Sequence, residues 1–159
     1  MSESRLSAAW ATLRAARRTA LIPYLTAGYP SPEASLDALR AADEVADIIE
    51  VGVPFSDPLA DGPTIQRSTF EALHAGMTLA GTLELISRAR LARPVVVFSY
   101  LNPILRYGVE RFLREAGRLG VGGLLLTDLP AGNDPAVESA VQASPLDLIR
   151  LVAPTTTGA

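Results

Sequence analysis

Glu50 is the acidic residue that interrupts the apolar segment Asp47–Val53 (DIIEVGV). Because successive side chains of a β-strand point to opposite faces, Glu50 shares one face with Ile48 and Gly52, and the other aliphatic side chains share the opposite face. Burial of a carboxyl group raises its pKa, which suits a general acid–base that works near neutral pH. The alternative is a glutamate at the edge or end of a strand, where the carboxylate reaches solvent.

Asp61 is the second candidate carboxylate. It follows Glu50 by eleven positions, in a loop that is rich in proline and glycine. Prolines restrict the backbone of such a loop, so its carboxylates can be held over the end of the strand. One buried and one positioned carboxylate together suit acid–base and binding roles. Two alternatives stay open: Asp61 caps a helix that begins near Thr64, and Asp57 is a turn residue.

The composition argues against several other kinds of chemistry. The chain contains no cysteine, which excludes thiolate nucleophiles, thiolate metal sites and a disulfide scaffold. Its one histidine, His74, has no neighbouring triad partner or metal ligand in the sequence, so no metal site is expected. A formal net charge of −3 and the lack of a long Lys/Arg run argue against nucleic-acid binding.

The sequence also indicates a cytoplasmic protein. No apolar run reaches the ~20 residues that a membrane-spanning helix needs. The N-terminal segment lacks the basic-then-apolar order of a secretory signal and is typical of an amphipathic helix.

Short β-rich runs alternate with helical patterns along the chain. The expected strands are 20–25, 47–53, 94–100, 122–126 and 147–152. Helices are expected after Ser31, within 64–91 with a break near residues 74–76, over 109–119, and after Asn133. Near-continuous apolar strands between helices predict a parallel sheet, either doubly wound or closed as a barrel.

The spacing of the strands favours the barrel. The repeats between residues 20 and 147 average about 32 residues, against ~31 per unit in a (β/α)8 barrel of ~250 residues. We therefore expect an α/β fold of the TIM (β/α)8 barrel type, here with about five βα units of an incomplete barrel. Residues 1–159 are expected to form a single domain, the N-terminal part of such a barrel.

Four segments resemble the α subunit of tryptophan synthase. The segment Ile49–Pro63 (IEVGVPFSDPLADGP) matches the signature of that family without a gap. The resemblance continues, in chain order, at Leu21–Pro30, Phe98–Pro103 and Leu126–Pro130.

This resemblance implies a lyase of tryptophan biosynthesis that cleaves indole-3-glycerol phosphate to indole and glyceraldehyde 3-phosphate. The retro-aldol step needs no metal or organic cofactor in this subunit. By position, Glu50 matches the catalytic acid–base of the family, and Asp61 matches the carboxylate that accepts a hydrogen bond from the indole N–H. Tyr24, Tyr100 and Thr127 fall where the family lines its indole pocket, with ordinary core packing as the alternative.

The resemblance also implies a partner, the tryptophan synthase β subunit, which carries pyridoxal phosphate, in an α2β2-type assembly. The residues that match the partner interface are Pro54, Phe55, Ser56, Asp57, Pro58, Asn102 and Pro130. Loop or capping roles are the alternatives for Asn102 and for Asp128. The phosphate-binding loops of the family are expected beyond residue 159. A second hypothesis is therefore a catalytically inactive partial barrel that only binds the β subunit.

Overall fold

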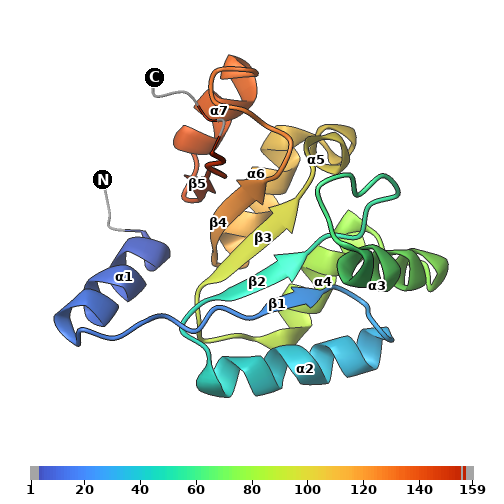
Figure 1. The fold of residues 1–159 in the computed structure, drawn as a ribbon, viewed down its shortest axis with the longest axis horizontal. Coiled ribbons are helices and arrows are strands. Elements are labelled where there is room, and N and C mark those ends of the chain that lie inside the picture. Colours follow the sequence, from blue (N-terminus) through green and yellow to red (C-terminus); the bar gives the residue numbers. More distant parts are fainter. Residues whose placement is uncertain (1–3, 155, 157–159) are drawn as a thin grey trace.

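The computed structural model describes residues 4–154 and residue 156 of the 159-residue chain. Helices and strands alternate along most of this length (Figure 1). The elements are α1 (Arg5–Ala15), β1 (Tyr24–Thr26), α2 (Pro32–Val45), β2 (Ile49–Gly52), α3 (Pro63–His74), α4 (Leu79–Ala89), β3 (Val95–Ser99), α5 (Leu101–Tyr107), α6 (Val109–Arg118), β4 (Val121–Leu126), α7 (Pro135–Gln142) and β5 (Asp147–Ile149).

The five strands form one parallel sheet in the order β1-β2-β3-β4-β5. In a doubly wound sheet the strand order reverses at a switch point. Over the described residues each strand pairs with its neighbours in sequence, which is the order of a barrel wall. Of the two predicted architectures, the structure therefore has the barrel type.

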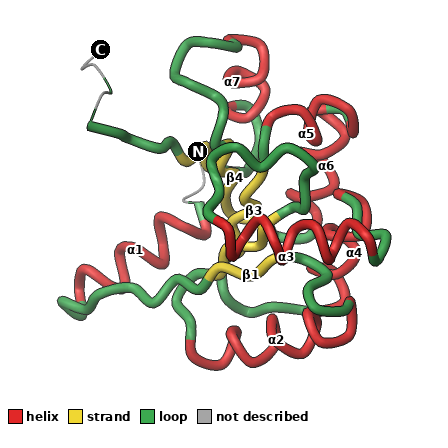
Figure 2. The backbone as a smooth tube through the Cα atoms, turned by 45° about the vertical axis from the view of Figure 1, so that its right-hand side comes forward, coloured by secondary structure: helices red, strands yellow, loops and turns green. Residues whose placement is uncertain are grey.

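The two faces of the sheet are covered differently (Figure 2). Helices α2 to α7 pack on the outer face, where a large core includes Ile49, Val51 and the fully buried Phe112. The inner face carries a smaller cluster formed by Leu6, Ile48, Val96 and Leu125. Val51 and Ile48 thus lie on opposite faces, as the period of two predicts.

Helix α1 covers the inner face at the amino ends of the strands. The Arg5 guanidinium donates hydrogen bonds of 2.7 Å to the carbonyl oxygens of Ala92 and Gly120, which precede β3 and β4. The Leu6 side chain packs where glycines 122 and 123 leave space; a Cβ at Gly123 would lie 2.6 Å from Leu6 Cδ1. These contacts tie the N-terminal helix to the middle of the sheet.

Helix boundaries follow the signals in the sequence. The side chains of Ser31, Thr78 and Asp134 accept hydrogen bonds at the N-termini of α2, α4 and α7. Gly120 has a positive φ of 76° and follows α6, as expected for a glycine that ends a helix. The predicted break near 74–76 separates α3 from α4.

Three elements differ from the expectation by three residues or more. Strand β5 ends at Ile149, although a strand is expected over 147–152. Strand β1 begins at Tyr24, although a strand is expected over 20–25. Pro23 has no N–H, and the N–H of Leu21 donates to the Asp47 side chain instead of to a neighbouring strand. Helix α5 was not predicted, because its seven residues contain Pro103 and directly follow β3. Among the described residues, no helix is long and apolar enough to cross a membrane.

Candidate active site

Glu50 lies on the inner face of β2, between two strands. Its register partners are Tyr24 on β1 and Val96 on β3, so β2 is not an edge strand over the described sheet and the edge-strand alternative is wrong. The side chain is half-buried, and burial raises the pKa of its carboxyl group. A raised pKa brings this carboxyl group closer to the range in which a general acid–base works.

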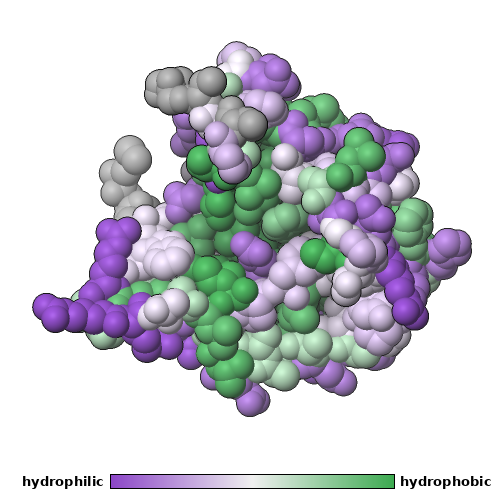
Figure 3. All heavy atoms as spheres, in the orientation of Figure 1, coloured by the Kyte–Doolittle hydropathy of each residue, from purple (hydrophilic) through white to green (hydrophobic). Residues whose placement is uncertain are grey.

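A cavity of about 270 Å³ lies next to Glu50, which lines it, between the inner face of the sheet and α1. Its walls include Leu6, Ile48, Val96 and Ile149. Figure 3 shows apolar side chains gathered in the hollow between α1 and the β4–β5 edge of the sheet. The lining is mostly apolar, with Ser7 and Asp147 as its other polar members. Burial against this lining accounts for the direction of the Glu50 pKa shift.

Asp61 is held by the residue that follows β3. The Tyr100 hydroxyl donates a hydrogen bond of 2.9 Å to Asp61 Oδ2 and accepts one of 2.8 Å from the backbone N–H of Ala60. The N-cap residue of α3 is Gly62, and no side chain caps that helix. The capping interpretation of Asp61 is therefore wrong, and its carboxylate faces the end of the sheet.

Two tyrosines beside these carboxylates remain neutral. Burial raises the pKa of Tyr24 to about 12, and the negative charge of Asp61 adds to the rise. Burial also raises the pKa of Tyr100, although the N–H of Ala60 opposes the shift. Both side chains therefore stay protonated around neutral pH and keep a hydroxyl that is able to donate a hydrogen bond.

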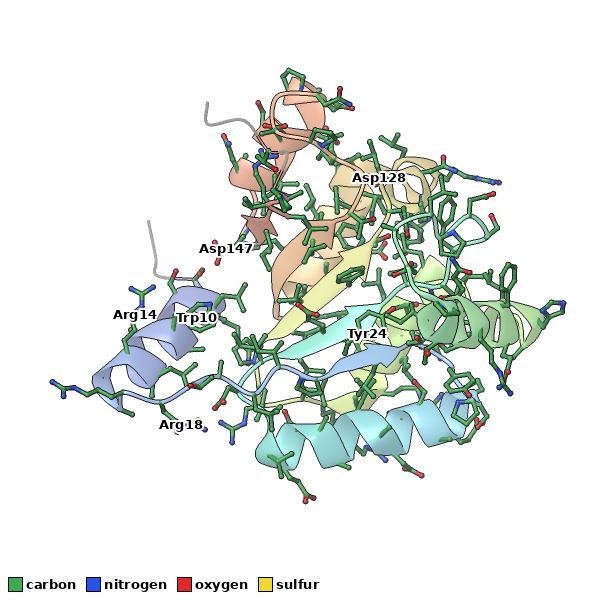
Figure 4. All side chains as sticks on the ribbon, in the orientation of Figure 1. Trp10, Arg14, Arg18, Tyr24, Asp128 and Asp147 are labelled. Carbon is green, nitrogen blue, oxygen red and sulfur yellow. The ribbon has the colours of Figure 1, made fainter. Side chains whose placement is uncertain are left out.

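The polar groups come from consecutive strands and lie toward the carboxyl ends of those strands, where the Tyr24 ring reaches the level of Gly52. Tyr24 begins β1, Glu50 lies within β2, Tyr100 follows β3 and Thr127 follows β4 (Figure 4 labels Tyr24). The backbone N–H of Thr127 donates to the carbonyl of Ser99 at 3.1 Å, which continues the ladder of β3 and β4. The carboxyl-end face of parallel barrel strands is where such folds place their active sites.

Phe98 is a residue of this site that the sequence analysis missed. Its ring meets Tyr24 edge-on, with centroids 5.3 Å apart and an interplanar angle of 81°. The alternation of side chains along β3 could have revealed it, because Phe98 lies two residues after Val96. Val96 belongs to the inner cluster, and Phe98 packs against that cluster. The apolar run Val95–Phe98 hid this alternation, since both faces of the strand are apolar.

Four of the predicted interface residues line a second cavity, of about 400 Å³. Pro54, Phe55 and Ser56 contribute from the loop after β2, and Asn102 contributes from α5. Arg106 and Tyr107 of α5 also line this cavity and were not predicted. The other predicted interface residues, Asp57, Pro58 and Pro130, do not line it.

The cavity is joined to the carboxylates by an aromatic contact. The rings of Phe55 and Tyr100 have centroids 5.1 Å apart. Asp128 has the capping role that was left open, because its Oδ1 accepts a hydrogen bond of 2.7 Å from the N–H of Leu101, the first residue of α5. Asn102 is an exposed residue of that helix, so a loop position for it is wrong.

The described residues contain no group of three or more histidine, cysteine, aspartate or glutamate side chains that could hold a metal ion. His74 is exposed, and its Nδ1 lies 2.9 Å from the carbonyl oxygen of Phe70, one turn earlier in α3. This contact pairs the Nδ1 atom within its own helix.

Comparisons with a family model and with curated proteins find the same family. The family model described as tryptophan synthase alpha chain matches residues 10–159. The tryptophan synthase alpha chain of Nitratidesulfovibrio vulgaris (strain DP4) is 46% identical over 159 residues, with 98% of this chain and 62% of that protein covered. The corresponding protein of Gluconacetobacter diazotrophicus is 50% identical, with 96% and 57% covered.

Solved structures agree with these relatives. Tryptophan synthase from M. tuberculosis in its aminoacrylate-bound form has a TM-score of 0.91 at 44% identity, covering 97% of this chain and 64% of that one. The alpha subunit from Legionella pneumophila str. Paris has a TM-score of 0.90 at 37% identity, covering 98% and 61%. The predicted fold class is confirmed. The chain spans about three-fifths of the length of the curated relatives that it matches, and over that span it belongs to the tryptophan synthase alpha chain family.

Proposed function

We propose that the protein carrying this chain is a lyase that cleaves indole-3-glycerol phosphate to indole and glyceraldehyde 3-phosphate. The observation that carries the proposal is a pair of carboxylates near the Tyr24 hydroxyl: Glu50, half-buried with a raised pKa, and Asp61, held by Tyr100. Family membership supplies the substrate class, and the pair supplies groups suited to the chemistry.

The proposed reaction requires two proton movements. The protonated Glu50 carboxyl group gives its proton to C3 of the indole ring, which leaves a cationic iminium at the ring nitrogen. The glycerol hydroxyl next to C3 then loses its proton, and its oxygen forms a carbonyl group as the carbon–carbon bond breaks. The bonding electrons return to the ring and restore indole. The Glu50 carboxylate is placed to take the hydroxyl proton, so it ends the cycle protonated.

Asp61 has an electrostatic role in this proposal. Its carboxylate accepts a hydrogen bond from the indole N–H and stabilises the positive charge that develops there. The hydrogen bond from Tyr100 fixes one oxygen of this carboxylate and leaves the other available. Tyr24, Tyr100 and Thr127 are proposed to line the indole pocket. Tyr24 lies near both carboxylates, Tyr100 binds Asp61, and Thr127 lies beside Tyr100.

The proposal includes a partner but no cofactor in this subunit. Pyridoxal phosphate is proposed to belong to the partner, the tryptophan synthase β subunit, in an α2β2-type assembly. Support comes from solved relatives described as tryptophan synthase. The proposed contact surface comprises Pro54, Phe55, Ser56, Asp57, Pro58, Asn102 and Pro130. We further propose a cytoplasmic location, and that residues 1–159 form one domain, the N-terminal part of the barrel.

The experiment that tests this function measures indole released from indole-3-glycerol phosphate by the complete protein that carries this chain. We expect release by the wild type and a severe loss in Asp61→Asn, because a neutral amide stabilises a cation less than a carboxylate does. Asp37→Asn serves as the control, since Asp37 lies on α2 with 81% of its side chain exposed. No indole from the wild type would contradict the function, and normal rates in Asp61→Asn would contradict the role of Asp61.

A second candidate function is binding of the β subunit without catalysis. The observation in its favour is that neither Glu50 nor Asp61 lines the cavity formed by Pro54, Phe55 and Asn102, so a partner could bind there without the two carboxylates. Titration of the chain into the β subunit distinguishes the two candidates. Binding and a changed β-subunit rate, without any release of indole, would favour this second function.

A further inference from the structure

Tyr24 stands beside Glu50 on the inner face of the sheet. The two residues are register partners in the parallel strands β1 and β2, and Val96 of β3 is the register partner on the other side. Side chains that pair in register on neighbouring strands point to the same face. Glu50 therefore has an aromatic residue, Tyr24, on one side and an aliphatic residue, Val96, on the other.

Gly52 leaves the space that the Tyr24 ring occupies. A Cβ atom at position 52 would lie 2.0 Å from Tyr24 Oη and 2.5 Å from its Cζ, distances that no side chain could keep. The ring therefore extends from β1 across β2 at the level of Gly52. This level lies two residues, or about 6.6 Å, beyond Glu50 toward the carboxyl ends of the strands.

Phe98 supports the ring from the third strand. Gly52 is the register partner of Phe98, and the edge-on contact between Phe98 and Tyr24 spans the gap that the glycine leaves. The Tyr24 ring is thus fixed between its own strand and Phe98, directly over the backbone of β2. An edge-on pair of this kind contributes about 0.5–1.5 kcal/mol beyond the burial of its area.

The Tyr24 ring adds no charge next to Glu50. Tyr24 is neutral around pH 7, because burial and the carboxylates of Asp61 and Glu50 raise its pKa to about 12. Tyr24 therefore replaces water on one side of the glutamate with a neutral aromatic surface.

We propose that Tyr24 is a positioning residue for Glu50: its ring, which lies over Gly52 and contacts Phe98, excludes water from the side of the Glu50 carboxyl group that faces β1 and the carboxyl ends of the strands. The inference rests on the proposed acid–base role of Glu50, because a covered carboxyl group holds its proton at a higher pH. The aromatic ring of Tyr24 excludes the water, so the Tyr24 hydroxyl group is not needed to keep the Glu50 carboxyl group protonated at the higher pH.

The experiment titrates Glu50 directly in the complete protein. Infrared difference spectra are recorded across pH for each variant against the same variant carrying Glu50→Gln, which isolates the carboxyl band of this residue. We expect Tyr24→Ala and Gly52→Ala to shift the titration midpoint of Glu50 to lower pH, because one removes the ring and the other displaces it. Tyr24→Phe keeps the midpoint of the wild type, and so does the control Phe70→Ala, whose ring is exposed on α3.

An unchanged midpoint in Tyr24→Ala would overturn the proposal, and so would an equal shift in Tyr24→Phe and Tyr24→Ala. Circular dichroism melts establish that each variant is folded; if Gly52→Ala does not fold, Tyr24→Ala and Tyr24→Phe decide the question. The proposed function fails by a different result, normal indole release in Glu50→Gln, which leaves the titration of Glu50 unaffected.

Discussion

The hydroxyl of Tyr100 lies 2.9 Å from Asp61 Oδ2 and joins the end of β3 to the loop that follows β2. The Tyr100 hydroxyl oxygen also accepts a hydrogen bond of 2.8 Å from the backbone N–H of Ala60, so one side chain holds two consecutive residues of that loop. The Asp61 carboxylate is therefore held by a tertiary contact with Tyr100, while the Asp61 carbonyl oxygen accepts a hydrogen bond of 2.9 Å from Gln66 Nε2 of α3.

Tyr100→Phe tests this anchor. The change removes both hydrogen bonds and keeps the ring, which is only 5% exposed. Because neighbouring loop residues such as Leu59 are open to solvent, water can replace part of the loss. We expect the free energy of unfolding to fall by about 1 kcal/mol in urea denaturation, and limited proteolysis to cut the loop between residues 56 and 61 faster.

Tyr107→Phe is the matched control for this prediction. It also removes a hydroxyl that binds a carboxylate, that of Glu115 on α6, but it leaves the bonds of Ala60 and Asp61 intact. Equal protease sensitivity of the loop in both variants would show that Tyr100 does not anchor it.

The sequence predicted the barrel order, the helix starts after Ser31 and Asn133, and the face that Glu50 shares with Ile48, because these depend on local periodicity and on single capping residues. The role of Asp61 could not be decided in this way. Whether it caps α3 or faces the sheet depends on Tyr100, which lies 39 residues later in the chain. The first residue of α5, Leu101, is likewise bound by Asp128, 27 residues away, so this short helix depends on a distant partner.

Leu6→Ala tests the attachment of α1. Leu6 is 5% exposed and packs against the inner cluster and the two glycines of β4. Removal of a buried leucine side chain leaves a cavity, and we expect a loss of about 2–4 kcal/mol in the free energy of unfolding. Leu59→Ala, at a residue that is 92% exposed, should leave the stability unchanged. Similar effects of the two substitutions would contradict the packing of α1.

Asp47→Asn should destabilise the protein in a pH-dependent way. Asp47 accepts the N–H of Leu21 at 2.8 Å and pairs with Arg18, and these contacts lower the pKa of its carboxyl group. A lowered folded pKa stabilises the fold above the ordinary aspartate pKa of about 3.9 and loses that effect as the pH falls through the folded value. The variant should melt below the wild type at pH 7, and the difference should narrow below about pH 4. A difference that is constant from pH 7 to pH 3 would contradict this explanation.

Glu50→Gln should have the opposite effect on stability. Burial raises the pKa of Glu50, so its ionisation opposes folding as the pH rises above the ordinary glutamate pKa of about 4.3. We expect the variant to melt above the wild type at pH 7 and the gain to shrink as the pH falls toward 4. The exposed Glu84→Gln on α4 is the control and should show no such trend. A melting temperature that falls in Glu50→Gln at pH 7 would show that the charged form is stabilised by the fold.

The central claim is that Glu50 carries the proton in the proposed cleavage. The most direct measurement compares kcat for indole release from indole-3-glycerol phosphate in the wild type, Glu50→Gln and Glu84→Gln, each in the complete protein and each verified as folded. Loss of a positioned general acid–base lowers the rate by about 10²–10⁴-fold, so we expect a loss of that size in Glu50→Gln and wild-type rates in Glu84→Gln. A loss of less than about tenfold in a folded Glu50→Gln variant would contradict the assignment.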